Sequence, residues 1–162
     1  MFPRDPTLAG FQDFITSVMG INALYLPPDA LVIGYAFAVA LAIVNPELRG
    51  IPPHCWMPTP GVPQISIYAI AVYNLAGSNV INFAQDQPGR TYFRKKRKEL
   101  DINSWQAGVV ASTADSSTST ALLNPEFMKG LTLENLQQLK DPWGRAYLGI
   151  AQAYGPGIVG IS

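Results

Sequence analysis

Ala30-Leu-Val-Ile-Gly-Tyr-Ala-Phe-Ala-Val-Ala-Leu-Ala-Ile-Val44 is the longest uninterrupted apolar stretch of the chain, and it decides the fold class. A helix needs about 20 apolar residues to cross the hydrocarbon of a membrane, and this stretch is shorter. Pro27 and Pro28 precede it, and Asn45-Pro46 stops it. We therefore predict that it is a buried core helix, apolar on every face, that forms the central helix of the fold and does not span a membrane.

Further helices are predicted on both sides of this stretch. Asp5-Pro6 has the pattern of an N-cap followed by a first-turn proline, and apolar residues then recur at helical spacing until a helix end near Gly20. Pro63 begins a long third helix that is predicted to end near Pro88, and its asparagines argue against a membrane span. The prolines between the second and third helices predict an ordered loop.

The last predicted helix has the clearest boundaries. Asp141-Pro142 places a capping side chain before a first-turn proline, and Gly155-Pro156 provides a C-cap followed by a helix breaker. A short helix is predicted before it, at residues 132–139. Residues 156–162 form an apolar tail that either packs back or adds a strand to a neighbouring subunit. The predicted apolar face of the last helix carries Trp143, Tyr147, Ile150, Ala151 and Tyr154.

Residues 108–121 are rich in serine, threonine and other small residues, and two interpretations of them compete. Alternating residues on either side of a turn at Asp115-Ser116 predict an antiparallel hairpin arm over about residues 106–123. A disordered serine-threonine linker is the alternative. We favour the arm, because the alternation continues from Val109 to Thr113 and from Thr118 to Leu122.

The composition predicts one domain that associates with other proteins. A chain of 162 residues fits a single core, so residues 1–162 form one domain whose helical parts lie at about 6–100 and 124–155. Charged residues make up 14% of the chain, against about 25% in ordinary soluble domains, and a large uncharged surface is usually covered by a partner. The predicted fold class is mainly α, a small helical bundle with an inserted β-hairpin arm and an extended C-terminal tail.

Residues that could carry catalysis or bind a metal are few. His54 and Cys55 are the single histidine and the single cysteine, and neighbouring side chains of an extended chain point to opposite faces. This argues against a catalytic pair and favours a structural corner packed by Trp56. Zinc needs four ligands, and the phosphate-loop and nucleophile-elbow motifs are absent. We expect no enzyme activity, no metal and no cofactor, and a lone cysteine suits a reducing cytosol.

Basic residues gather in one short segment although the net charge of the chain is zero. Clustered cations beside Tyr92 and Phe93 could bind phosphates and stack on bases, as in a basic nucleic-acid-binding module. An acidic protein surface would attract the same cations, and a solvated helix end is the third interpretation. The predicted partner or DNA contacts are Arg90, Arg94, Lys95, Lys96, Arg97 and Lys98.

The last third of the chain resembles a known family. The order of the segment Ala111-Ser-Thr-Ala-Asp-Ser-Ser-Thr-Ser-Thr120, a spacer, and Asp141-Pro-Trp-Gly-Arg-Ala-Tyr-Leu148 is similar to that of head-to-tail adaptor proteins, the head completion proteins of tailed bacteriophages. In these proteins a helical bundle is followed by a β-hairpin and by a last helix that is entered through a comparable Pro-aromatic-Gly-Arg-x-Tyr step. The resemblance covers about the last 55 residues, and the proline-rich loop around His54 has no counterpart in it.

The resemblance implies a structural virion protein at the head-tail junction, assembled in the host cytoplasm. Such a protein forms a dodecameric ring of identical subunits under the portal protein, extends the DNA channel without reading sequence, and offers a platform to a neck or tail-completion protein. No membrane is involved. The residues expected to contact other subunits or the portal are Val109, Thr113, Thr118, Trp143, Arg145, Tyr147, Ile158, Val159 and Ile161.

Overall fold

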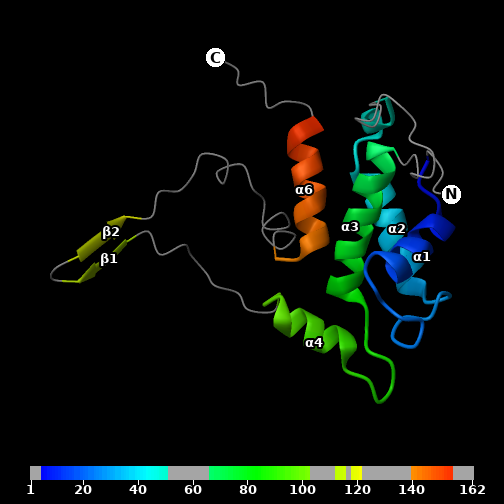
Figure 1. Ribbon diagram of the computed structural model, residues 1–162, viewed down its shortest axis with the longest axis horizontal. Coiled ribbons are helices and arrows are strands. Elements are labelled where there is room, and N and C mark those ends of the chain that lie inside the picture. Colours follow the sequence, from blue (N-terminus) through cyan, green and yellow to red (C-terminus); the bar gives the residue numbers. More distant parts are fainter. Residues whose placement is uncertain (1–4, 51–65, 103–111, 116–117, 122–139, 155–162) are drawn as a thin grey trace.

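The computed structural model describes residues 5–50, 66–102, 112–115, 118–121 and 140–154, and these residues are mainly helical. Figure 1 shows the helices side by side in one bundle, with α4 at one end of it. The elements, in chain order, are α1 (Leu8–Ser17), α2 (Leu31–Ile43), the 3-10 helix η1 (Pro46–Gly50), α3 (Ile67–Phe83), α4 (Tyr92–Glu99), β1 (Ser112–Asp115), β2 (Thr118–Ala121) and α6 (Pro142–Tyr154).

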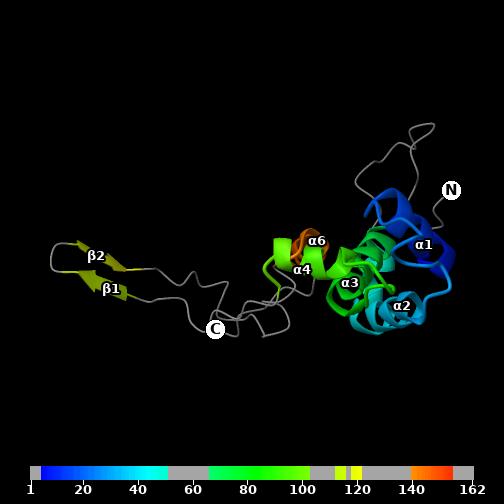
Figure 2. The same ribbon diagram turned by 90° about the horizontal axis from the view of Figure 1, so that it is seen from below.

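Helix α3 is the centre of the bundle. It lies between α1 and α2 on one side and α6 on the other, and both views show this order (Figures 1 and 2). Of its 17 residues, 13 are buried, including the large side chains Tyr68, Tyr73 and Leu75. Helices α2 and α6 both run opposite to α3 (Figure 1).

The prediction that residues 30–44 form the buried, central helix was wrong. The segment is helical, but only four of the 13 residues of α2 are buried, namely Ile33, Ala36, Phe37 and Ala40. Their spacing places them on one side of the helix, which packs against α3 and α1. The more polar helix α3 takes the centre instead, and two of its polar side chains are hydrogen-bonded there: Asn74 Nδ2 donates to Ile70 O of the same helix at 2.9 Å, and Ser78 Oγ donates to Asp141 Oδ2 at 2.7 Å.

An aromatic cluster holds α1 against α3. Phe11 is fully buried, and its ring stacks on those of Phe37 and Tyr73 with centroids 5.8 and 6.0 Å apart. The Tyr73 hydroxyl accepts a hydrogen bond from Thr7 N at 3.0 Å, just before α1 begins. It lies so close to Gly10 that a Cβ there would clash with it, so only glycine allows this approach.

Several helix ends differ from those expected. Thr7, and not Asp5, caps α1, because Thr7 Oγ1 accepts the Gly10 N–H at 3.1 Å. Gly20 has φ +66° and reverses the chain after α1, close to the predicted end. Helix α3 ends at Phe83, before the predicted end near Pro88. Beyond this end, Asp86 accepts the backbone N–H groups of Phe93 and Arg94 at the start of α4.

The two short strands pair with each other in antiparallel register, with Thr113 opposite Thr120 and Asp115 opposite Thr118. Asp115 thus belongs to a strand, although the sequence placed it in the turn. The remainder of the predicted arm, the helix at 132–139, the tail at 156–162 and most of the proline-rich loop lie outside the described residues. Within the described part of the chain, no helix combines the length and apolar character needed to cross a membrane.

Candidate functional site

The basic segment forms helix α4, and the structure separates its cations into different roles. Arg97 turns toward α3: its Nη1 donates hydrogen bonds to Ile81 O at 3.0 Å and to Ala84 O at 2.8 Å. Carbonyls at the end of a helix lack partners within the helix, and the negative end of the helix dipole favours a cation there. Arg97 is therefore a structural residue that fixes α4 to the end of α3.

Two further cations have partners within the fold. Lys96 Nζ donates to Glu99 Oε2 at 2.9 Å, and this hydrogen bond raises the pKa of Lys96 above its usual value. The Arg90 guanidinium lies over the ring of Tyr25, 5.4 Å from its centroid. These contacts are at the surface, so they contribute little stability, but they set where the two charges lie.

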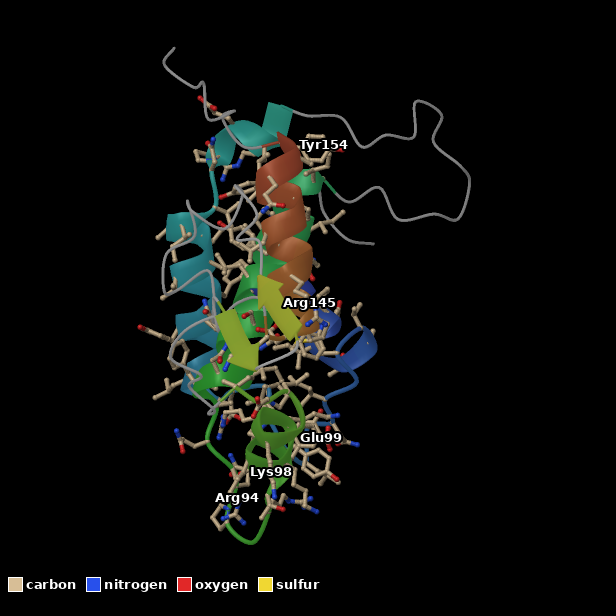
Figure 3. The ribbon with its side chains drawn as sticks, turned by 90° about the vertical axis from the view of Figure 1, so that its left-hand side faces the viewer. Arg94, Lys98, Glu99, Arg145 and Tyr154 are labelled. Carbon is tan, nitrogen blue, oxygen red and sulfur yellow. The ribbon has the colours of Figure 1, made fainter. Side chains whose placement is uncertain are left out.

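The remaining cations, Arg94, Lys95 and Lys98, are exposed. Their spacing of one and four residues places them on one side of α4, within about 100° of each other. Figure 3 shows Arg94 and Lys98 at the α4 end of the molecule, far from Tyr154 at the opposite end. The exposed basic surface of α4 thus consists of Arg94, Lys95 and Lys98. We call these three residues the α4 basic surface.

The aromatic residues beside this surface are used in packing. Phe93 is fully buried in the core. The Tyr92 ring stacks on Tyr25 with centroids 4.6 Å apart, and burial raises the pKa of the Tyr92 hydroxyl. Asp86 accepts the backbone N–H groups of Phe93 and Arg94 at 2.7 and 3.1 Å, which holds the start of α4 in place. The sequence suggested that these two rings could stack on nucleic-acid bases. In the structure both rings are already packed within the protein.

A buried carboxylate anchors α6 to α3. Asp141 is fully buried; it accepts a hydrogen bond from Ser78 Oγ at 2.7 Å and another from Gly144 N at 2.7 Å. The second bond is the predicted N-cap of α6, whereas the partner on α3 was not foreseen. Burial raises the pKa of the Asp141 carboxyl, and the hydrogen bonds from Gly144 and Ser78 and the charge of Arg145 oppose that rise.

The predicted subunit contacts on α6 are placed mainly inside the fold. Trp143 and Tyr147 are half-buried and pack against the core, together with Ile150 and Tyr154, so the predicted apolar face of this helix is confirmed. Arg145 is exposed, and Figure 3 shows it on the side of α6 between the α4 end and Tyr154. The other predicted contacts cannot be placed: the strand side chains of Thr113 and Thr118 are not described, and Val109, Ile158, Val159 and Ile161 lie outside the described residues.

An exposed apolar surface on α2 was missed by the sequence analysis. We call it the α2 outer face; it consists of Leu31, Gly34, Tyr35, Ala38 and Ala42. All five residues are exposed, and their spacing puts them on one stripe of the helix. Leu31 is 91% exposed and Tyr35 is 63% exposed. No sequence signal separates this stripe from the buried one, because α2 is apolar all round.

The described residues offer no catalytic arrangement. Among them, no three or more histidine, cysteine or acidic side chains come together in a group that could hold a metal ion. His54 and Cys55, the pair considered from sequence, lie outside this part of the chain. The surfaces that remain as candidates for function are the α2 outer face and the α4 basic surface. No protein family, curated protein or solved structure matches this chain.

Replacing Arg97 should separate its structural role from that of its exposed neighbours. We expect Arg97→Ala to lower the free energy of unfolding by about 1.5–3 kcal/mol, the typical contribution of hydrogen bonds made by a charged group. Lys95→Ala, the matched control on the same helix, should change it by less than about 0.5 kcal/mol. Urea denaturation followed by circular dichroism measures both, and equal losses would contradict the assigned roles.

Replacing Asp141 should reveal both its cap and its raised pKa. Asp141→Ala removes the N-cap and leaves the Ser78 hydroxyl without its acceptor, so we expect a loss of about 2 kcal/mol in unfolding free energy. Asp141→Asn keeps an oxygen acceptor for Gly144 and removes the charge. The comparison of these two variants at one pH measures the cap.

The pH dependence of the Asp141→Asn variant tests the raised pKa. The folded protein binds a proton at Asp141 more readily than the unfolded chain does, so this group's contribution to stability is complete below the ordinary carboxyl pKa. It declines as the pH rises through the raised pKa. The Asn variant should therefore gain stability relative to the parent over that range. Parallel stability-against-pH curves for the two proteins would contradict the assignment.

Proposed function

We propose that this chain is a structural subunit that assembles with copies of itself and with other proteins, and that it has no catalytic role. The observation that carries the proposal is the α2 outer face, where Leu31 and Tyr35 project from a helix without any charged residue. A stripe of this kind costs free energy in water and gains about 25 cal/mol for each Å² that a partner covers. Covering it is therefore the best-supported role of this surface.

The chemistry of the stripe suits a protein partner. Tyrosine is among the residues that contribute most to protein–protein binding, because its rigid ring covers a large area at little cost in conformational entropy. Gly34, Ala38 and Ala42 lie beside the two large side chains and allow another helix to approach closely. A nucleic acid or a charged ligand would find no complementary group on this face.

The resemblance to head-to-tail adaptors gives the proposal its finer form. In that form the subunits make a dodecameric ring in the neck of a tailed-phage virion, between the portal protein and a neck or tail-completion protein. DNA passes through the ring without sequence-specific contacts. The hairpin arm at about 106–123 and the apolar tail at 156–162 reach neighbouring subunits or the portal. The low charge of the chain, at 14%, supports extensive subunit packing.

A second candidate function is a basic nucleic-acid-binding module, and the α4 basic surface is the observation that favours it. Three exposed cations on one side of a helix can contact phosphates. The module lacks the stacking part of its mechanism, since Phe93 is buried and Tyr92 is stacked on Tyr25. We therefore rank it below assembly and assign the α4 basic surface to a contact with the passing DNA or with an acidic partner protein.

A charge on the α2 outer face should break the assembly without unfolding the subunit. We expect Tyr35→Glu to weaken self-association by about tenfold or more, the factor that corresponds to about 1.4 kcal/mol. Ala9→Glu, the matched control, adds the same charge at an exposed position of α1. Light scattering over a concentration series gives the masses, and circular dichroism checks the fold. A parent protein that is monomeric at every concentration would overturn the proposal of self-assembly.

DNA binding tests the second candidate. If the chain is an assembly subunit, it should bind a short duplex only in the weak range of non-specific binding, with Kd about 10⁻⁴–10⁻⁶ M. Replacing Arg94, Lys95 and Lys98 together by alanine should then reduce the slope of log K against log salt by about 2–3, since each phosphate contact accounts for about 0.9. Lys96→Ala, the control at a paired cation, should change the slope less. Much tighter binding by the parent would favour the nucleic-acid module.

A further inference from the structure

We infer that copies of this chain join head to tail, with the α2 outer face of one copy packed against the outward side of α6 of the next copy. The inference rests on the proposed self-assembly and names the two surfaces that would carry it. The α2 outer face is exposed and apolar, so covering it is favourable, and the outward side of α6 is the surface of the same chain that fits it.

The outward side of α6 has a complementary shape. Ala146, Gly149 and Ala153 are exposed and lie on one stripe of the helix, turned away from the buried residues Gly144 and Leu148. A Cβ built at Gly149 would meet no atom within 4 Å, so this stripe is open. The projecting side chains of Leu31 and Tyr35 can enter such a surface, as ridges enter grooves between packed helices.

The positions of the two surfaces favour a head-to-tail contact. Helices α2 and α6 lie on opposite sides of α3 (Figures 1 and 2), so the two surfaces of one copy cannot meet each other. A symmetric pair formed through α2 alone would leave α6 uncovered in both copies. When α2 meets α6, every copy covers both surfaces, and such contacts form a ring if the rotation between copies closes.

Charge near the ends of the two helices agrees with this pairing. Asp29 is exposed two residues before α2 begins, and Arg145 is exposed in the first turn of α6. Both helices start toward the same end of the molecule (Figure 1), and they run in the same direction. If neighbouring copies stand side by side with their α3 helices parallel, the carboxylate of one copy lies near the guanidinium of the next, which favours this register.

Disulfide cross-linking of the full chain tests the contact directly. In a Cys55→Ser background, we would combine Tyr35→Cys with Ala146→Cys, and separately Ala38→Cys with Gly149→Cys, so that two positions along the helices are sampled. Oxidation should give a ladder of dimers, trimers and larger species on a non-reducing gel. A variant with Tyr35→Cys alone, the control, should give no ladder and no dimer.

The possible results separate this inference from the proposed function. A dimer from Tyr35→Cys alone would overturn the head-to-tail contact in favour of a symmetric α2–α2 contact. Absence of cross-links in a protein that light scattering shows to be oligomeric would also overturn it and leave self-assembly standing through another surface. A monomeric mass for the Cys55→Ser protein at all concentrations would remove both proposals.

Discussion

The bundle depends on burying α3 against the elements around it, most of whose polar contacts with α3 are hydrogen bonds to buried groups. Its apolar side chains supply the attraction, since 13 of its 17 residues are buried. Three polar contacts then fix the elements around it: Thr7 to Tyr73 for α1, Ser78 to Asp141 for α6, and Arg97 to the last carbonyls for α4. Hydrophobic burial alone has no direction, so these contacts set the register of each element on α3.

Covering α3 determines what remains for function. Helix α2 and helix α6 each give one side to α3, and each keeps an outward side with almost no charge. A surface helix of an isolated domain normally presents charged residues to water. The outward residues of α2 are apolar instead, and this exposed apolar stripe is the observation behind the proposed assembly role. The proposed function therefore depends on the side of α2 that faces away from α3.

The sequence predicted the local features well and the arrangement of the helices poorly. The start of α6 was predicted correctly, because Asp141-Pro142 is a local signal of capping chemistry. The helix at residues 30–44 was also predicted, but its position was not. A helix that is apolar on all sides is fully buried only when enough other helices pack around it. The number of such helices cannot be read from the segment itself. The same limit hid the α2 outer face.

The basic run shows a second limit of sequence reasoning. Five consecutive cations suggest a continuous patch, but successive residues of a helix point about 100° apart, so such a run surrounds its helix. One side of α4 faces α3, and the cation on that side, Arg97, became a cap for its last carbonyls. Phe93, one turn before Arg97, is buried in the core. The sequence could not assign the role of Arg97, because its two partners lie 13 and 16 residues away in the chain.

In the proposed ring, the position of the α4 basic surface would let the three cations of each subunit act together with those of the other subunits. Helix α4 lies at one end of the bundle, whereas α2 and α6 run along the sides of the bundle (Figure 1). If copies join through α2 and α6 with their α3 helices parallel, all α4 helices gather at one rim of the ring. Three weak contacts per subunit then act together on one polyanionic partner, and such multivalent binding is far stronger than that of a single subunit. A modest basic surface is therefore sufficient in an assembly, although it would be insufficient in a monomeric nucleic-acid-binding module.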